Sequence, residues 1–366
     1  MRILDLPAGA TPRQWGRLHG ESFRNEIKEI GAIRLDLCAR VGGFAGEGEV
    51  LALARAHMPT LEAFDADLHA ELVGIAEGAG VDEGLIVVVN HYTDLRDLGP
   101  AFTGSRGGDV GGCTAALART PQGAFLGQTW DMHGSATPFV IGLNVPASQG
   151  APAALMLSIT GCVGMAGLNG AGVGVTINNL RSFDAAIGVV WPALVRRLLR
   201  ERSARVAFDL LMDSPIASGH HYLIADPDEG FGVETSGQLR RVVFDDPNGT
   251  FVHTNHCLDP EVEACSAVAP GSTTFERYDL MTASIRERPV EGFEDLWARF
   301  ASHEGYPRSV CTHMSSPEKP HATDTCGAAV FDLAGRRIRA AAGCIVQNPS
   351  ALFQLTPDGD AFEVRS

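Results

Sequence analysis

Long hydrophobic runs are missing from this sequence. No stretch reaches the roughly 18 uninterrupted apolar residues that a membrane-spanning helix requires. The first residues, MRILDLPAGATPRQW, also lack the long apolar run of a secretory signal peptide. These absences argue against a membrane protein and a secreted protein, so we expect a cytoplasmic location.

Positive charge is scarce. Lys and Arg together number 29 against 44 Asp and Glu, which gives a formal net charge of −15 at pH 7. So acidic a chain is a poor candidate for non-specific binding to nucleic acid or to anionic membranes, because these carry the same sign of charge. We expect neither as a partner.

Signatures of cofactor and metal sites are also absent. The eight cysteines include no C-x-x-C pair and no zinc-ribbon spacing, so we expect reduced thiols and no structural disulfide. The glycine pairs near residue 172 lack the third glycine of a dinucleotide fingerprint, and neither a P-loop nor a G-x-S-x-G elbow occurs. An S-x-x-K match at Ser316 lies in a proline-bearing loop and is best explained by chance. We expect no cofactor and no metal.

Apolar residues are plentiful, at 45% of the 366 residues, which is ample for one large domain or two ordinary ones. The first part of the chain has the pattern of helices. Thr11 and Pro12 predict an N-cap and a first helical residue, and amphipathic spacing continues to about residue 41 and again over 50–79. The β-rich run 85–89 fits a short buried strand or the end of a helix.

Short strands with glycine-rich connections dominate the middle of the chain. A hairpin is expected over 114–127, where Pro121 and Gly123 favour the turn. Further strands are expected over 139–145, 154–159, 173–177, 221–224, 232–234, 241–244 and 251–254, helices over 191–201, 204–212, 274–288 and 293–302, and a closing hairpin over 328–333 and 337–342. Helices at both ends with strands between them predict an α+β fold, in which helices cover two packed antiparallel sheets.

A glycine-rich loop, residues 99–112, leads directly into Cys113 and the strand-like run that follows it. Its glycines allow left-handed and strained backbone conformations at little steric cost. A thiol on a rigid strand, preceded by the most deformable part of the chain, is the arrangement expected if Cys113 attacks the carbonyl group before it and becomes a new N-terminus. The alternative is a small buried hydrophobic residue without catalytic function, which is the usual role of a free cysteine.

Asp131 follows at the far end of the predicted hairpin. The returning strand can place its carboxylate beside Cys113. There it could orient a free α-amino group and stabilise the charged form of that group. A solvated or turn-capping aspartate is the alternative.

Two further segments offer polar groups at the ends of predicted strands. In residues 253–256 (HTNH), Asn255 has an amide donor suited to an oxyanion. The two histidines of this segment lack the glutamate of a helical H-E-x-x-H, so we interpret them as hydrogen-bonded structural residues and not as a zinc site. Asn178 and Asn179 could line an oxyanion site or form a turn.

Taken in order, these motifs resemble the acyl-coenzyme A:6-aminopenicillanic acid acyltransferase (isopenicillin N acyltransferase) family, a branch of the N-terminal nucleophile hydrolases. The resemblance extends from residues 16–20 (GRLHG) to the closing hairpin, and the order and spacing of the motifs are more specific than any one of them. The motifs are Gly112-Cys113-Thr114, Trp130-Asp131, Gly167-Leu168-Asn169, Asn178-Asn179-Leu180 and His253-Thr254-Asn255-His256.

The resemblance implies a four-layer αββα fold and a precursor that cuts itself between Gly112 and Cys113. Residues 1–112 would then form a helical subunit and residues 113–366 a catalytic subunit, together making one globular domain. Cys113 would be the nucleophile, its freed α-amino group the base, Asp131 the orienting carboxylate and Asn255 the oxyanion donor. The other residues expected at the oxyanion or substrate-binding site are Thr129, Trp130, Asn179, His256 and Thr312.

The sequence departs from the pattern of the family at one position that concerns substrate binding. Where the family often has Ser-Ile-Cys-Arg-His, residues 309–313 read Ser-Val-Cys-Thr-His, so Thr312 replaces an arginine that can contact substrate. This replacement bears on the identity of the substrate more than on the type of reaction.

We therefore expect a self-processing cysteine amidohydrolase that cleaves a linear amide, such as a small N-acyl amino acid or N-acyl amine, through a thioester on Cys113. The nearest alternative is an acyltransferase that passes the same thioester to an amine. A non-catalytic binding protein on the same fold is an alternative of another class, and a papain-like protease fits poorly because the segment of Cys113 has the pattern of a strand. The expected partners are a small-molecule amide and the chain's own two fragments as a heterodimer, with a higher homo-oligomer left open.

Overall fold

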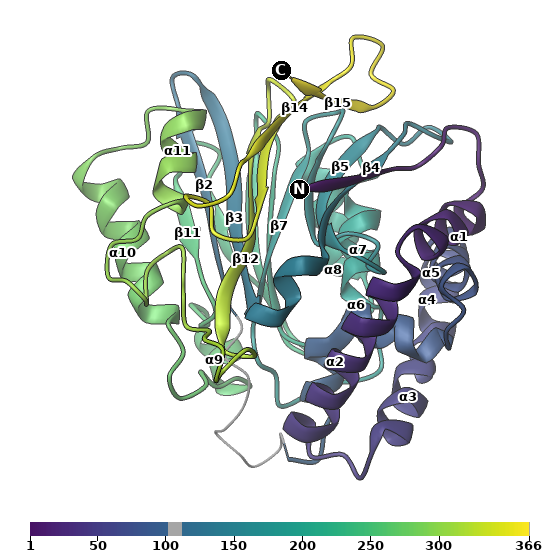
Figure 1. Ribbon diagram of the computed structural model, residues 1–366. Coiled ribbons are helices and arrows are strands. Elements are labelled where there is room, and N and C mark those ends of the chain that lie inside the picture. The colour runs from purple at the N-terminus through teal and green to yellow at the C-terminus, as the bar shows by residue number, and fades with distance from the viewer. Residues whose placement is uncertain (102–111, 366) are drawn as a thin grey trace.

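Two β-sheets packed on one another form the centre of the molecule, with helices outside them (Figure 1). This computed structural model describes residues 1–101 and 112–365. Most of the predicted glycine-rich loop, residues 102–111, thus lies outside the described residues, whereas Gly112 and Cys113 lie inside them. The helix–sheet–sheet–helix layering confirms the predicted α+β class and its αββα arrangement.

Each sheet of the described residues is almost entirely antiparallel. The larger sheet contains, in spatial order, β1 (Arg2–Asp5), β4 (Val140–Val145), β5 (Ala154–Ile159), β6 (Ala166–Asn169), β7 (Gly174–Asn179), β8 (His220–Ala225), β9 (Gly230–Thr235) and β10 (Arg240–Asp245). The smaller sheet contains β11 (Phe251–His253), β2 (Gly112–Thr120), β3 (Gly123–His133), β12 (Thr323–Asp332), β13 (Arg337–Ala342), β14 (Ala351–Leu355) and β15 (Phe362–Arg365). The exception is β1, which pairs parallel with β4 at the edge of the larger sheet.

Helices lie on the outer sides of the two sheets. The first layer comprises α1 (Pro12–Ser22), α2 (Arg24–Gly42), α3 (Glu47–Ala56), α4 (Met58–Phe64), α5 (Ala66–Ala79), α6 (Glu83–Asp97), α7 (Trp191–Leu198) and α8 (Ala204–Asp213). Of these, α8 contacts β8 and β9 of the larger sheet. The other layer, at the left of Figure 1, comprises α10 (Thr274–Glu287), which contacts β2 and β11, and α11 (Phe293–Phe300), which contacts β3 and β12. The remaining elements of residues 1–101 and 112–365 are a short 3₁₀ helix (Gly134–Phe139) and α9 (Pro260–Ala264).

Strand β2 shows how the sheets are held between layers. Ala115 and Leu117 belong to the large apolar cluster that joins the two sheets. The alternate residues Ala116 and Ala118 belong to a second cluster, which joins the smaller sheet to Phe293 and its neighbours on α11. Successive side chains of a strand point to opposite faces, so a segment buried on both faces is apolar at successive positions, as residues 115–118 are. The strand that carries Cys113 is therefore fixed from both sides.

Several sequence-based predictions of local structure are confirmed. Thr11 is the N-cap of α1, and its hydroxyl accepts a hydrogen bond from the Gln14 backbone N–H at 3.3 Å. Ser203 caps α8 in the same way. The hairpin of β2 and β3 and the closing hairpin of β12 and β13 are present.

Other expectations need correction. The run 85–89 lies inside α6 and forms neither a strand nor the end of a helix, because Asp82 caps a helix whose Ile86 to Val89 are all fully buried. Burial on every side favours apolar residues whatever their β propensity. The first long helical pattern is divided at Phe23 into α1 and α2. Strands β1, β6, β14 and β15 were not predicted.

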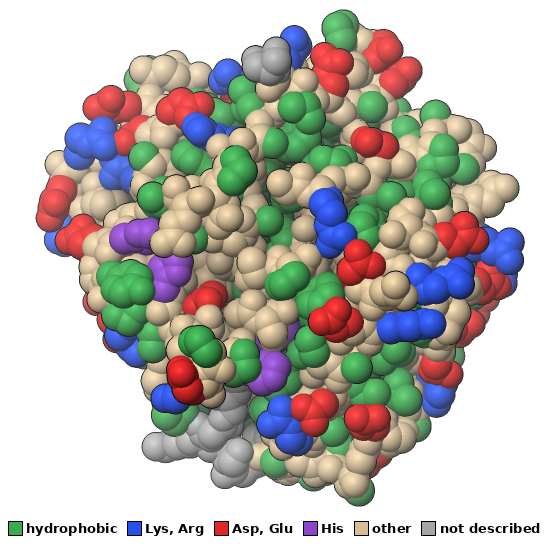
Figure 2. Space-filling view, viewed as in Figure 1, with side chains coloured by type: hydrophobic (Ala, Val, Ile, Leu, Met, Phe, Trp, Pro, Cys, Tyr) green, Lys and Arg blue, Asp and Glu red, His purple; other side chains and the backbone are tan. Residues whose placement is uncertain are grey.

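Acidic and basic side chains are interspersed over the face of the molecule shown in Figure 2. On the described part of this face the charged groups therefore do not gather into a surface of one sign. Within residues 1–101 and 112–365, no helix combines the length and the apolar character needed to cross a membrane.

Candidate active site

Cys113 is the second residue of β2 and lies opposite Trp130 of β3. Only 6% of its surface is exposed. Its side chain borders a small cavity between the two sheets and the helices near them. The cavity is lined by Thr93, Arg96, Gly112, Cys113, Trp130, Asp131, Met132, Ile177, Asn179, Trp191 and His220. The predicted nucleophile therefore lies on a rigid strand at the wall of a largely apolar space.

The backbone nitrogen of Cys113 is held by Asn255. The Cys113 N–H donates to Asn255 Oδ1 at 2.7 Å, and Asn255 Nδ2 donates to the backbone carbonyl of Asn179 at 2.9 Å. Asn255 follows β11, which pairs with β2, so the sheet register carries the side chain to the start of the Cys113 strand. The amide oxygen of Asn255, and not its NH₂ group, faces the nitrogen of Cys113.

Asp131 is fully buried beside Cys113, in register with Gly112. Its Oδ1 accepts a hydrogen bond from Thr325 Oγ1 at 2.7 Å, and its Oδ2 accepts one from Thr129 Oγ1 at 3.4 Å. Burial raises the pKa of the Asp131 carboxyl, while the nearby guanidinium of Arg277 acts in the opposite direction. The hairpin thus brings Asp131 next to Cys113, and Thr129 lies behind this carboxylate and outside the cavity.

Arg277 on α10 connects these groups, although no motif or spacing in the sequence pointed to it. Its side chain is 1% exposed. Nη1 donates to the Cys113 carbonyl at 2.7 Å and lies 3.6 Å from Asp131 Oδ2, while Nη2 donates to Asn255 Oδ1 at 2.8 Å. One buried guanidinium therefore contacts the backbone of Cys113 and both of its predicted partners.

Gly112 packs tightly under the same groups. A Cβ atom at this position would lie 2.5 Å from Arg277 Nη2 and 3.1 Å from Asn255 Oδ1. The peptide bond between Gly112 and Cys113 can keep this position only because residue 112 has no side chain.

The asparagine pair at the end of β7 also reaches the site. Asn178 Nδ2 donates to the Cys113 carbonyl at 3.0 Å. Asn179 lines the cavity, and its backbone amide lies near the Cys113 sulfur. The pair therefore does not form a free turn, and both asparagines contact the surroundings of Cys113.

The thiol of Cys113 is protonated at neutral pH. Burial and then the charge of Asp131 raise its pKa to about 12, and the charge of Arg277 and the backbone amides of Asp131 and Asn179 only partly oppose this rise. Thiolate formation at this site needs a further positive charge or a base.

Helix α6 contributes cavity residues that the sequence did not single out. Arg96 Nη2 donates to Asp97 Oδ1 at 2.9 Å and to Asn179 Oδ1 at 3.3 Å. His220 from β8 bonds through Nε2 to Asp94 Oδ1 at 2.8 Å. Nothing in the sequence pattern of α6 or β8 shows that these side chains face a cavity.

Besides Thr129, two of the predicted substrate-binding residues lie outside the cavity lining, His256 and Thr312. His256 Nδ1 is 3.1 Å from Thr254 Oγ1, and burial lowers the pKa of its imidazole to about 4. The Thr312 backbone N–H donates to Thr325 Oγ1 at 2.8 Å, so Thr312 is separated from Asp131 by Thr325. The prediction that His253 and His256 are hydrogen-bonded structural residues agrees with their contacts, since His253 Nε2 bonds Glu234 Oε1 at 2.7 Å.

Comparison with known proteins identifies the family. The sequence model of the acyl-coenzyme A:6-aminopenicillanic acid acyl-transferase family matches residues 118–344, more than half of the chain. The chain belongs to this family. The range matched by the acyl-transferase family includes Asp131, Asn255 and Arg277 and begins shortly after Cys113. Membership makes the chain an enzyme of acyl chemistry, which transfers acyl groups or hydrolyses amides.

A curated member of the acyl-transferase family is similar over almost its full length. The 40 kDa form of acyl-coenzyme A:6-aminopenicillanic-acid-acyltransferase from Emericella nidulans is 27% identical over 363 residues, which cover 97% of this chain and 96% of that protein.

Solved structures of lower similarity include two hydrolases. A mutant of the conjugated bile acid hydrolase from Clostridium perfringens has a TM-score of 0.46 and 12% identity, over 69% of this chain and 96% of that one. Penicillin V acylase from Agrobacterium tumefaciens has a TM-score of 0.41 and 12% identity, over 67% of this chain and 86% of that one.

Proposed function

We propose that the chain cuts itself between Gly112 and Cys113 and then acts as an N-terminal cysteine amidohydrolase. Its substrate is the linear amide of a small N-acyl amino acid or N-acyl amine, and its intermediate is a thioester on Cys113. The proposal rests on the position of the two reactive atoms of Cys113, its backbone nitrogen and its sulfur, which lie in the same site. The nitrogen is bound to Asn255 at 2.7 Å, and the sulfur borders the cavity.

The tight environment of Gly112 supports self-cleavage at this bond. The Cys113 sulfur attacks the Gly112 carbonyl carbon, forming an S–C bond while the C–N bond breaks and the nitrogen takes the proton of the thiol. Water then hydrolyses the resulting thioester, which leaves a carboxylate on Gly112 and a free α-amino group and thiol on Cys113. The products are fragments 1–112 and 113–366, and no other reactant is needed.

The freed α-amino group supplies the base that the buried thiol lacks. An α-amino group has a pKa of about 7.7–8.0, so it can accept the proton of the thiol near neutral pH. The ammonium so formed beside the sulfur favours the thiolate. One residue thus provides both nucleophile and base, and no Cys–His pair is required.

The neighbouring groups have separate tasks in amide cleavage. Asn255 Oδ1 accepts a hydrogen bond from the amine, and Asp131 orients that amine together with Arg277. The backbone amide of Asn179 and the side-chain amide of Asn255 donate to the oxyanion of the tetrahedral intermediate, and a donor so placed is worth about 3–4 kcal/mol of barrier. The substrate C–N bond breaks as the leaving amine takes the proton from Cys113, and water then releases the acid from the thioester.

The lining of the cavity suggests the part of the substrate that binds there. Trp130, Met132, Ile177 and Trp191 offer apolar surface next to the sulfur. An acyl group of modest size fits such a surface better than a charged group does, since burial of apolar area is favourable. Thr129, His256 and Thr312 lie outside this lining, so their predicted contact with substrate remains a separate prediction.

The first test is the intact mass of the purified protein. We expect two masses, for Met1–Gly112 and Cys113–Ser366, and a single full-length mass for Cys113→Ala, which will show no amidase activity. Cys265→Ser, a half-exposed cysteine away from the site, is the matched control and should cut and act as wild type does. Wild-type protein that stays whole yet hydrolyses amides, or an active Cys113→Ala variant, would refute the proposal.

Acyl transfer to an amine is the second candidate function, favoured by the family of the chain. The two reactions share the thioester and differ in what attacks it. Incubating the processed enzyme with an acyl thioester, with and without an amine acceptor, separates them. Free acid formed at the same rate in both samples indicates hydrolysis, whereas an amide product formed at the expense of acid indicates transfer. A protein that forms no acyl-enzyme with the acyl thioester or with a linear amide would be a binding protein.

A further inference from the structure

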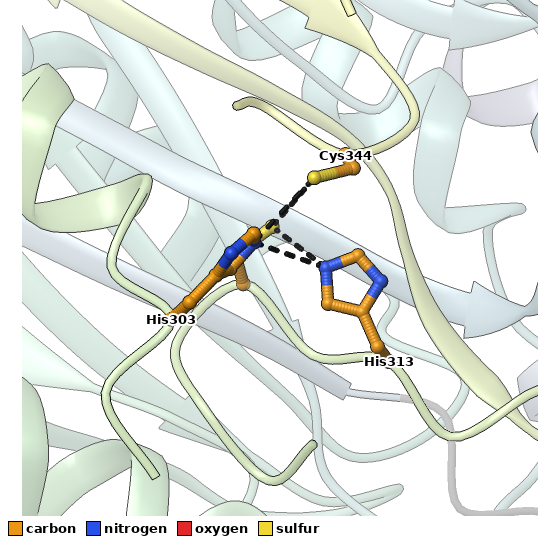
Figure 3. Close-up of side chains that lie close together, drawn as sticks. His303, His313 and Cys344 are labelled. Carbon is orange, nitrogen blue, oxygen red and sulfur yellow. Dashed lines mark hydrogen bonds between the residues drawn. The ribbon is translucent and has the colours of Figure 1, made fainter. Parts of the chain in front are cut away.

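Two histidines and two cysteines converge at a place that the proposed reaction does not use. Cys311 and His313 lie in the long segment between α11 and β12, His303 lies at the start of that segment, and Cys344 follows β13. Their ligand atoms all lie within 4.8 Å of one another. Figure 3 shows His303, His313 and Cys344 directed toward a common point. Four ligand-type side chains from three parts of the chain thus surround one position.

The distances between these atoms match a tetrahedral metal site. Bonds of about 2.3 Å from zinc to sulfur and about 2.0–2.1 Å to nitrogen give tetrahedral edges of roughly 3.8 Å between sulfurs, 3.3 Å between nitrogens and 3.6 Å between sulfur and nitrogen. Cys311 Sγ lies 3.9 Å from Cys344 Sγ, and His303 Nε2 lies 3.1 Å from His313 Nε2. Two of the four sulfur–nitrogen edges are 3.6 Å, from Cys311 to His313, and 3.4 Å, from Cys344 to His303, and the other two are no longer than 4.8 Å.

We propose that His303, Cys311, His313 and Cys344 bind one Zn²⁺ ion. Two sulfur and two nitrogen ligands in a tetrahedron suit zinc better than the hard cations Mg²⁺ and Ca²⁺, which prefer oxygen. All four positions are filled by protein, so no position is open for water or substrate. The ion is therefore structural and takes no part in the chemistry at Cys113.

Charge balance favours this ion in a buried place. Cys311 is fully buried and Cys344 is 6% exposed. Binding of Zn²⁺ converts two thiols to thiolates and releases two protons, while both imidazoles stay neutral, so the net charge of the cluster does not change. A buried cation without such compensation would be costly.

The location of the cluster suggests what the ion stabilises. Residues 301–322 contain no helix and no strand beyond isolated bridges. Cys311 and His313 flank Thr312, whose backbone N–H bonds Thr325, and Thr325 Oγ1 in turn donates to Asp131. The ion would tie this irregular segment to the end of β13 and so position the residues behind Asp131.

A disulfide between Cys311 and Cys344 is the main rival. The sulfurs are 3.9 Å apart, whereas a bond requires about 2.05 Å, and a disulfide would leave the two histidines without a shared partner. The disulfide and the zinc site exclude each other, because oxidised sulfurs cannot act as thiolate ligands.

The test is metal content of the full-length protein, freed of any affinity tag and dialysed against Zn²⁺ and then against metal-free buffer. We expect one zinc per chain by elemental mass spectrometry, and at least a tenfold lower content in Cys344→Ser and His313→Ala. Cys265→Ser, which lies outside the cluster, should keep one zinc per chain. Zinc below a tenth per chain in the wild type, or equal zinc in the wild type and the cluster variants, would overturn the proposal.

Cobalt provides a readout that does not depend on the variants folding. Wild-type protein loaded with Co²⁺ should show the intense visible bands of tetrahedral cobalt and a thiolate-to-cobalt charge-transfer band. Weak octahedral bands without charge transfer would contradict the site, as would a Cys311–Cys344 disulfide found by peptide mapping of freshly purified protein. None of these readouts uses enzyme activity, so the zinc site and the proposed reaction can fail separately.

Discussion

A single guanidinium group, that of Arg277, neutralises the buried carboxylate of the site. Arg277 and Asp131 are both fully enclosed, and Nη1 of the arginine also bonds the Cys113 carbonyl. Removal of one partner of a buried pair leaves an uncompensated charge, at a cost of about 3–5 kcal/mol. Loss of Arg277 is therefore expected to destabilise the folded site.

We predict that Arg277→Met lowers the free energy of unfolding by about 3 kcal/mol at pH 7.5 and by less at pH 5. Burial already raises the pKa of Asp131, and loss of the arginine raises it further. A carboxyl with a raised pKa binds more protons folded than unfolded between its two pKa values, so stability falls as pH rises through that interval. Chemical denaturation in a Cys113→Ala background, which keeps one chain, measures the effect.

The matched control for this prediction is Arg288→Met, which removes an exposed arginine that pairs with Glu291 and Asp295 and should change stability by no more than about 1 kcal/mol. Asp131→Asn combined with Arg277→Met should remove the pH dependence of the loss. If Arg277→Met lowered the free energy of unfolding by the same amount at both pH values, the charge of Asp131 would not be the cause of the loss.

At the scale of elements, helices α1 and α5 approach so closely that glycine is required between them. A Cβ atom on Gly16 would meet the Glu71 carbonyl oxygen and would lie 2.8 Å from the Ile75 backbone nitrogen. Gly74 on α5 faces the backbone of α1 in the same manner. The two helices therefore pack backbone to backbone and tolerate no added volume.

We predict that Gly16→Ala destabilises the protein by about 1–3 kcal/mol, because overpacking forces the two helices apart. A shift of the thermal unfolding midpoint to lower temperature measures the loss. Gly48→Ala on α3 is the control, since a methyl group at this position would have no neighbour within 4 Å and alanine is the better helix former. Equal midpoints for Gly16→Ala and wild type would show that the helices can separate freely.

The sequence was sufficient to predict elements whose signals are local. Turn residues Pro121 and Gly123 predicted the hairpin, and the hairpin register alone places Asp131 opposite Gly112. Arg277 could not be predicted, because an arginine on a helix has the pattern of a solvated residue until the neighbouring elements are known. Thr312 was expected at the substrate and lies behind Thr325, because side-chain direction in an irregular segment is set by tertiary contacts. The sequence analysis expected no metal and missed the cluster of His303, Cys311, His313 and Cys344, because only the fold of the irregular segment and its contact with the end of β13 bring these side chains together.

At the scale of the whole molecule, the proposed cut separates parts that are paired in space. Residues 1–112 contribute β1, which forms a parallel ladder with β4 from Ile141 to Asn144, as well as helices α1 to α6. Isoleucine, leucine and valine side chains of these helices belong to the same apolar cluster as the strands of 113–366. Loss of one peptide bond leaves this buried contact in place.

We predict that fragments 1–112 and 113–366 stay bound to each other after cleavage. Native mass spectrometry of processed protein should give one species with the summed mass of both fragments, and denaturing conditions should give two. The uncut Cys113→Ala variant is the control and should give one mass in both conditions. Separation of the fragments in native buffer would contradict the shared core.

The pairing of β1 with β4 also affects how the protein refolds after denaturation. Before the cut, the two strands belong to one polypeptide, and refolding is a unimolecular event whose yield does not depend on dilution. After the proposed cut they would belong to different molecules, so a denatured sample would have to regain its sheet through a bimolecular encounter. Mature enzyme that has once unfolded would then be restored efficiently only at high concentration, whereas the newly made chain folds equally well alone.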